Sequence, residues 1–191
     1  MPRPTFFLDC GHGTDNRTPG VFDPGAVALG TSEYAIVQTI AHDVAYALRD
    51  QYDVVLTPEV SLNDVVAWVN ERATNRDMLF ALHMNAGPAK ATGVEVIHAH
   101  TAPMERAAQA TLVANVCAHV MGIPCRGVRL DTDTPAGARN GLAILRDTTC
   151  PALLVELGFI TNKTDVERVR LKGTLAICES IRKINEVFGD G

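Results

Sequence analysis

Short apolar segments alternate with helical segments along the chain, and this alternation predicts the fold. Brief runs of β-branched or alternating hydrophobic residues favour strands, and they occupy residues 5–9, 53–57, 78–83, 93–98, 142–145 and 152–157. Between them, apolar residues recur at helical spacing over 32–50, 62–74, 104–121 and 164–187. Strands that alternate with helices predict an α/β fold with a mainly parallel, twisted sheet of about six strands and helices on both faces.

Two polar segments interrupt this pattern. Residues 11–30 are rich in glycine and proline, and residues 123–141 are mostly polar, so we expect long loops there. Long loops in a compact domain are often functional. The chain contains no internal repeat and no evident linker. We therefore expect a single domain over 1–191, without a separate second domain.

Composition narrows the classes of partner. The chain has 191 residues, of which 47% are hydrophobic and 20% charged, and its net charge is −5. The acidic balance and the lack of a long basic run argue against a nucleic-acid partner. No apolar run is long enough to span a membrane, and the apolar stretch near the N-terminus is too short for a signal peptide. The five cysteines form no CxxC pair, so we expect reduced thiols.

Four polar residues lie at or near the ends of predicted strands. His12 follows the first strand in LDCGHG, His83 ends the third in LHMNAG, and Glu156 lies near the end of the last in LLVELGFITN. Glu33 opens the helix that follows the first long loop. In open α/β sheets, ligands bind beyond the carboxyl ends of the strands. We therefore expect these four side chains to form one site.

Each of these residues also has a structural interpretation. Glu33 could favour the positive end of a helix dipole, and His83 could be a hydrogen-bonded core histidine. However, flanking glycines leave His12 little side-chain cover, and Glu156 lies in an apolar strand, where a carboxylate is costly to bury without a partner. Two histidines and one carboxylate form a familiar catalytic zinc set with an open fourth position. A second carboxylate can then act as general base and acid.

The other candidate ligands have weaker support. His42 and His119 lie within predicted helices, where we expect them to be surface or core residues. His98 and His100 lie at or beyond the end of the fourth strand and could line the cleft or bind substrate. Cys10 could be a fourth, soft ligand, although it would close the site to water.

Four ordered motifs resemble the zinc-dependent N-acetylmuramoyl-L-alanine amidases of the family called amidase type 3. That family opens with Asp-Pro-Gly-His-Gly-Gly followed by Asp-Pro-Gly-Ala, and then has an early helical glutamate. Ser-(Ile/Leu)-His-X-Asn-Ala and Val-Glu-X-Gly-Phe-X-X-Asn follow. The matching segments here are DCGHG (9–13), DPGA (23–26), SEY (32–34), ALHMNA (81–86) and VELGFITN (155–162). The resemblance spans nearly the whole chain, so it implies a single catalytic amidase domain over 1–191 without a separate cell-wall-binding domain.

This resemblance implies a function and a role for each residue. His12, Glu33 and His83 would hold one Zn²⁺ per chain, and Glu156 would be the catalytic general base and acid. The reaction would be hydrolysis of the amide between the lactyl group of N-acetylmuramic acid and L-alanine in peptidoglycan. The zinc-bound water would attack the carbonyl, and zinc would stabilise the developing oxyanion.

The sequence departs from the family pattern at three places. Cys10 replaces a proline, Ala81 stands where serine is common, and residues 14–22 lengthen the first loop. None of these is a proposed ligand. Asn85 could orient the site through hydrogen bonds or simply stabilise a turn. Arg139 could contact a carboxylate of the peptide, or it could be a solvated loop residue.

The expected location follows from the lack of a signal peptide. A phage endolysin made in the cytoplasm and released through a holin would reach the cell wall without one, and we expect no direct protein partner and no membrane insertion. The alternatives are a cytoplasmic amidase that recycles peptidoglycan fragments and the catalytic domain of a larger autolysin. A zinc peptidase or deacetylase, or a non-catalytic wall-binding domain on the same fold, is also open.

Overall fold

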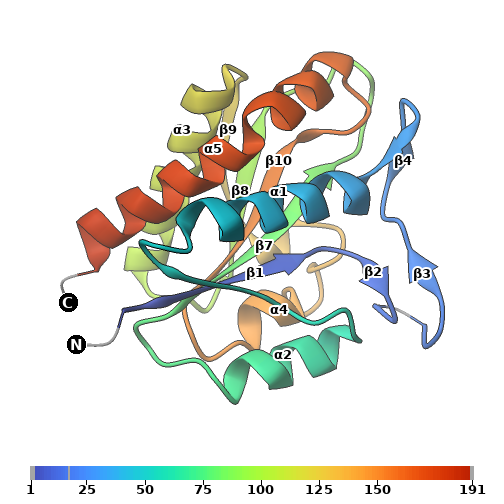
Figure 1. Ribbon diagram of the computed structural model, residues 1–191. Coiled ribbons are helices and arrows are strands. Elements are labelled where there is room, and N and C mark those ends of the chain that lie inside the picture. The colour runs from blue at the N-terminus through green and yellow to red at the C-terminus, as the bar shows by residue number, and fades with distance from the viewer. Residues whose placement is uncertain (1–2, 17, 190–191) are drawn as a thin grey trace.

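The fold is a layered α/β structure around one six-stranded sheet (Figure 1). The computed structural model describes residues 3–16 and 18–189. Across the sheet, the strands are β6 (Asp53–Leu56), β1 (Thr5–Cys10), β7 (Met78–Asn85), β10 (Ala152–Phe159), β8 (Val94–His98) and β9 (Cys125–Leu130). All neighbouring pairs are parallel except β10 and β8, which are antiparallel. The predicted fold class is therefore confirmed.

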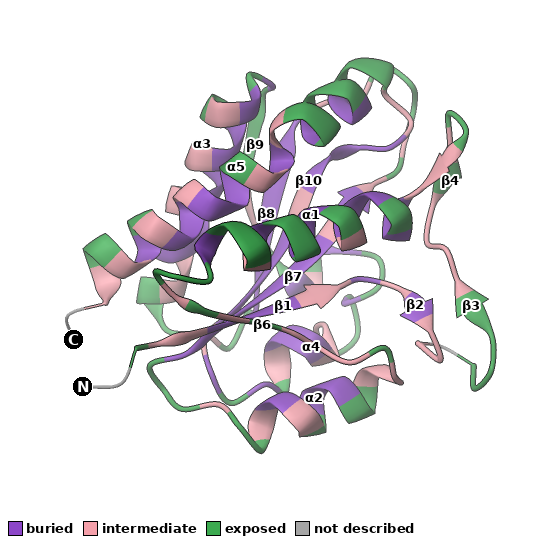
Figure 2. Ribbon diagram, in the orientation of Figure 1, coloured by how far each residue is buried: buried purple, intermediate pink, exposed green. Residues whose placement is uncertain are grey.

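Helices cover both faces of the sheet. One face carries α1 (Glu33–Leu48), α3 (Met104–Met121) and α5 (Lys163–Phe188), and the other carries α2 (Leu62–Asn70) and α4 (Ala143–Arg146). Successive strand residues point to opposite faces, so Leu8 joins the first core while its neighbour Phe7 joins the second. The central strands are buried on both sides (Figure 2), which explains why they form continuous apolar runs in the sequence.

One predicted strand is wrong, and another was not predicted. Residues 142–145 form most of the short helix α4, whose Ile144 and Leu145 pack into the second core beside α2. An apolar run this short does not distinguish a strand from a buried helical turn. The sixth strand is instead β9, at the edge of the sheet within the segment expected to be a loop. The sequence did not predict this strand because it begins with the exposed residues Cys125 and Arg126. An edge strand needs few apolar residues, so it lacks the apolar run used to recognise strands.

The first long polar segment lies beyond the end of the sheet where β1 and β7 finish, whereas the second begins with β9 in the sheet and continues into a loop (Figure 1). The first contains two small ladders, β2 (Gly13–Thr14) with β3 (Phe22–Asp23) and β4 (Val27–Ala28) with β5 (Thr31–Ser32). The second contains a 3-10 helix, η1 (Asp131–Asp133). The buried carboxylate of Asp131 accepts hydrogen bonds from the backbone N–H groups of His100 and Leu142, at 2.9 and 3.0 Å. These bonds fix the second loop against the sheet.

Within the described ranges, none of the helices combines the length and apolar character that a membrane span requires.

A buried aspartate joins the carboxyl end of β10 to the helix that follows it. Asp165, in the first turn of α5, accepts hydrogen bonds from the backbone N–H groups of Gly93 and Phe159, both at 2.9 Å, and from the Thr92 hydroxyl at 2.6 Å. Asp165→Ala would leave these buried donors unpaired. We expect it to lower the free energy of unfolding by about 3 kcal/mol or more, measured by urea denaturation.

Asp165→Asn is the matched control for this prediction. Because its amide oxygen can still accept some of these hydrogen bonds, its free energy of unfolding should fall by less than that of Asp165→Ala. Asp43 lies exposed on α1, and Asp43→Ala should change stability by less than about 0.5 kcal/mol. A loss in Asp165→Ala no larger than that of Asp43→Ala would contradict the prediction.

Candidate functional site

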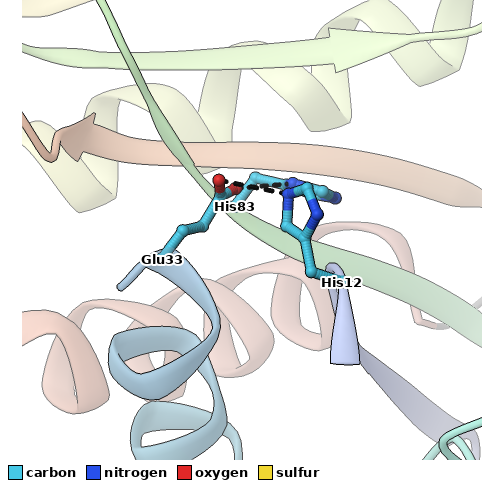
Figure 3. Close-up of side chains that lie close together, drawn as sticks. All are labelled: His12, Glu33 and His83. Carbon is cyan, nitrogen blue, oxygen red and sulfur yellow. Dashed lines mark hydrogen bonds and ion pairs between the residues drawn. The ribbon is translucent and has the colours of Figure 1, made fainter. Parts of the chain in front are cut away.

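Three of the predicted ligands meet at the end of the sheet. His12 follows β1, Glu33 begins α1 and His83 lies in β7. Their ligand atoms all lie within 4.8 Å of one another, and the two imidazoles turn toward the Glu33 carboxylate (Figure 3). Segments separated by up to 71 positions thus form one cluster, counted from His12 to His83.

Glu33 is the centre of this cluster. Its carboxylate contacts His12 Nε2 at 3.1 Å through Oε2 and His83 Nδ1 at 2.8 Å through Oε1. It also accepts hydrogen bonds from the backbone N–H groups of Ala26 (3.1 Å) and Met84 (3.0 Å). A carboxylate in the first turn of a helix is favoured by the helix dipole, and Ser32 caps α1. Glu33 is therefore held from four sides and almost fully buried.

The backbone around His12 explains why glycines surround it. His12 has a φ of 76°, a left-handed conformation that is uncommon for residues other than glycine and is often found at functional sites. A Cβ on Gly11 would lie 2.1 Å from the His83 ring, and one on Gly25 would lie 2.6 Å from the His12 ring. Asp23 contacts His12 Nδ1 at 2.9 Å, and such a carboxylate fixes the orientation of an imidazole whose other nitrogen binds a metal.

The protonation states of Glu33, His12 and His83 depend on one another. Burial alone would raise the pKa of Glu33, but hydrogen bonds from His12 and His83 outweigh it and hold that pKa below its usual value. Burial opposes the charged form of His83, yet the hydrogen bond to Glu33 and the nearby Glu156 raise its pKa to about 9. The pKa of His12 is also raised, because its bonds to Glu33 and Asp23 exceed the effect of burial. The cluster therefore favours bound positive charge.

Glu156 lies beside the cluster in the middle of the sheet. In the strand register it is paired with His83 of β7 on one side and with Glu95 of β8 on the other. Its Oε2 is buried and has no hydrogen-bond partner in the part of the chain that the structure describes. Burial raises the pKa of Glu156 to about 7, against the attraction of His83. A carboxyl group with a pKa near neutrality can both accept and donate a proton at physiological pH.

The cluster opens into a cavity of about 490 Å³. His12, His83 and Glu156 line it, together with Asn85. The other charged side chains in its wall are Asp9, Glu95 and Arg129. Its wall also includes residues of α2, α4 and the loop after η1, among them Pro135, Leu142 and Ile144. The second long loop therefore forms part of the cavity, as expected for a functional segment.

The other candidates are placed differently. Asn85 lines the cavity, whereas Arg139 is exposed in the second loop and is not among the described lining residues. Cys10 lies on the opposite side of β1 and contacts the first core, and burial raises its thiol pKa to about 12, which disfavours the thiolate ligand. It lines, with the exposed His42, a neighbouring cavity of about 380 Å³.

The remaining histidines do not join the cluster in the described structure. His98 is buried and its Nδ1 lies 2.9 Å from the carbonyl of Ala99. His100 contacts the buried Asp131 through Nδ1 at 2.9 Å. Both therefore support the strand end and the second loop rather than the cavity wall. His119 is exposed on α3.

Sequence reasoning missed three residues that shape the site. Asp23 orients His12, although it was noticed only as part of a motif. Glu95 lies in the alternating strand GVEVIH, where a carboxylate among apolar residues carries the same signal that singled out Glu156. Arg129 lies in β9, which was not predicted as a strand.

The donor set fits a divalent metal ion. Two zinc ligands at about 2.1 Å in tetrahedral geometry lie about 3.4 Å apart. The contacts from Glu33 to His12 Nε2 and His83 Nδ1 are 3.1 and 2.8 Å, so a small outward shift of the rings would admit an ion. A cation would take the place of the protons that the imidazoles share with the carboxylate.

The raised pKa of Glu156 predicts a pH-dependent effect on the stability of metal-free protein. The pKa is 4.5 ordinarily and about 7 in the folded protein, so the folded state binds a proton more tightly, and stability falls as pH rises through this window. Glu156→Gln lacks the titrating group. We expect its free energy of unfolding, relative to wild type, to increase by about 2–3 kcal/mol between about pH 5 and about pH 8, measured by urea denaturation with a chelator.

Glu71→Gln is the control for this pH series, because Glu71 lies on the exposed end of α2. Its stability relative to wild type should not change with pH in this way. A Glu156→Gln difference that stays constant between the two pH values would contradict the buried, proton-binding carboxyl.

Comparison with known proteins places this site in a family. The chain matches the model of a family described as N-acetylmuramoyl-L-alanine amidase over residues 6–183. It is 25% identical over 171 residues to the uncharacterized protein YqiI of Bacillus subtilis, covering 86% of this chain and 74% of that protein.

Two solved structures have the same fold. An N-acetylmuramoyl-L-alanine amidase from Clostridium difficile has a TM-score of 0.79 at 23% identity, covering 99% of this chain and 100% of that one. The catalytic domain of the amidase CwlV from Bacillus (Paenibacillus) polymyxa has a TM-score of 0.76 at 22% identity, covering 96% and 99%. Because the family model covers nearly all of the sequence, the chain belongs to the N-acetylmuramoyl-L-alanine amidase family.

Proposed function

We propose that this chain uses zinc held by His12, Glu33 and His83 to hydrolyse the amide between the lactyl group of N-acetylmuramic acid and L-alanine in peptidoglycan. The observation that carries the proposal is the buried Glu156 carboxyl group, whose Oε2 has no described partner beside the three-residue cluster. A structural carboxylate would be expected to have its oxygens hydrogen-bonded. A carboxyl group that exchanges protons with substrate and water needs one oxygen without a protein partner.

The residues of the cluster would act as one preorganised unit. His12 and His83 would bind through Nε2 and Nδ1, the nitrogens that face Glu33. Asp23 would keep the His12 ring in place through Nδ1. When bound, zinc supplies Lewis-acid polarisation of the amide carbonyl and of the attacking water. The rigid backbone contacts of Glu33 would hold this geometry before substrate arrives.

Glu156 would carry the proton through the reaction. As a carboxylate, it accepts a proton from the water that attacks the carbonyl carbon. As an acid, it donates that proton to the L-alanine nitrogen, so the C–N bond breaks and a free amino terminus leaves. The pKa of about 7 suits both steps, because neither protonation state is strongly favoured near neutral pH.

Metal binding tests the proposed ligands. We expect Glu33→Gln to weaken zinc affinity by at least about 10-fold, since it removes the anionic ligand that both histidines contact. Titration with a competing zinc chelator would measure the change. His119→Gln, on the exposed surface of α3, should bind zinc as wild type does. Equal affinities for Glu33→Gln and wild type would contradict the ligand assignment.

Loss of the general base should separate binding from chemistry. We expect Glu156→Gln to keep one zinc per chain and to lower kcat about 10²–10⁴-fold. The assay would follow the release of L-alanine amino termini from purified peptidoglycan. A Gln variant that cleaves at the wild-type rate would exclude Glu156 as the base. If zinc-loaded wild type released no L-alanine termini but cleaved another amide of the stem peptide, the zinc peptidase alternative would replace the amidase.

The biological setting stays a prediction. The fold is shared with the catalytic domain of the CD27L endolysin, with a TM-score of 0.70 and 23% identity over 94% of this chain, and with the bacterial amidases described above. We propose that this chain acts on the cell wall. The phage endolysin predicted from the sequence is one kind of protein that would do so.

A further inference from the structure

A buried carboxylate in the cavity wall is paired with two arginines. Glu95 of β8 is 4% exposed and lines the cavity. Its Oε1 lies 3.6 Å from Arg126 Nε, and its Oε2 lies 3.4 Å from Arg129 Nη1. One carboxylate thus faces two guanidinium groups, of which only Arg129 is among the described residues that line the cavity. A buried carboxylate needs such compensation, but a single arginine would suffice.

An irregularity in β9 brings both arginines to the same carboxylate. Residues three apart in a regular strand point to opposite faces. Here Val94 is paired with Cys125, whereas the next residue, Glu95, is paired with Gly127. Arg126 is therefore the extra residue of a β-bulge, and Gly127 has a φ of 93°. Such bulges often re-aim side chains beside active sites.

The two arginines differ in what else they contact. Arg126 lies over the Phe159 ring, with 5.1 Å from the guanidinium carbon to the ring centroid, and is not among the described residues that line the cavity. Arg129 lines the cavity, and its Nη2 donates to the carbonyl of Asp133. Within the described structure, the contacts of Arg129 with Glu95 and Asp133 occupy two of its five guanidinium N–H donors, and Arg129 keeps 39% of its side-chain surface exposed. It is the one lysine or arginine among the described lining residues.

The position of Arg129 sets the distance at which it can act. Its Nη1 lies 3.4 Å from Glu95 Oε2, and Glu95 is the register partner of Glu156 on the adjacent strand. With a strand spacing of about 4.8 Å, the guanidinium lies within about 8 Å of the Glu156 side chain. An extended peptide covers about 3.5 Å per residue, so a group bound by Arg129 lies about two residues from the bond beside Glu156. The stem peptide on the L-alanine side carries a carboxylate at that distance, on its second residue when that residue is D-isoglutamate.

We infer that Arg129, held in place by Glu95 and the β9 bulge, binds a carboxylate of the stem peptide and makes this amidase selective for acidic stems over amidated ones. The inference rests on the proposed function, since it names the part of the substrate that the same cavity receives. A guanidinium distinguishes a carboxylate from a carboxamide because the charged hydrogen bond is stronger and can be bidentate. Arg129 is a specificity residue and takes no part in proton transfer.

The test compares two soluble substrates that differ at one group: N-acetylmuramoyl-L-alanyl-D-isoglutamate and the same compound with D-isoglutamine. For zinc-loaded wild type we expect kcat/KM to be about 10- to 100-fold higher for the acidic compound, mainly through KM. Arg129→Gln should lose this preference by falling on the acidic compound alone. Arg129→Lys should keep part of it, because a point charge replaces the planar fork. Thermal unfolding would check that both variants fold.

Arg139→Gln is the matched comparison, because it removes the same charge from the second loop outside the described cavity wall. It should keep the wild-type preference. Equal rates of wild type on both compounds, or an equal loss in Arg129→Gln on both, would overturn the inference while leaving the amidase intact. The same would follow if Arg139→Gln, and not Arg129→Gln, removed the preference.

Binding gives a readout that does not depend on turnover. Calorimetric titration of the two compounds into Glu156→Gln protein should show about 10-fold or greater tighter binding of the acidic one, and Arg129→Gln in that background should abolish the difference. Equal affinities, or no measurable binding of either compound, would overturn the inference. Failure of wild type to cleave either compound while the binding preference persists would instead count against the proposed reaction.

Discussion

The carboxylate of Glu33 is the constraint on which the site depends. It joins the start of α1 to the end of β7 and to both sides of the first long loop, through two imidazoles and two backbone N–H groups. Burying an ionised group is costly unless all its acceptor capacity is used, and here each oxygen has both an imidazole and an amide partner. The contacts that bring the three candidate ligands together are thus also the contacts that satisfy the buried charge of Glu33.

Two buried carboxylates on neighbouring strands are treated in opposite ways. Glu95 is neutralised by arginines from the edge strand, whereas Glu156 has no arginine or lysine partner among the described residues and carries a raised pKa. Each lies next to the other in register, so the negative charge of Glu95 adds to the effect of burial on Glu156. Pairs of titratable groups pushed apart by their surroundings are typical of acid–base sites. The sheet thus places a carboxylate with arginine partners and a carboxyl group with a raised pKa a single strand spacing apart.

Much of this could be predicted from the sequence, and the failures have physical causes. The central strands are apolar on both faces, so β1, β7 and β10 were recognisable, and the residues at their ends met as expected. The edge strand β9 was not recognisable from its sequence, CRGVRL. One edge of this strand faces solvent, and its arginines contact Glu95, so it lacks an apolar run. Which of two strand carboxylates stays unpaired depends on which strand lies beside the arginines. Local sequence does not contain that information, since it arises from strand order.

The order in which the strands are synthesised differs from their order in the sheet. β10 lies between β7 and β8 in the interior of the sheet, yet it is the last of the six sheet strands in chain order. His12, Glu33 and His83 all come from the first half of the chain, so they are synthesised before β10. Glu156 and this central strand leave the ribosome together, after all three residues of the cluster. A chain released before β10 is made would hold the cluster residues but lack Glu156 and the strand that completes the middle of the sheet.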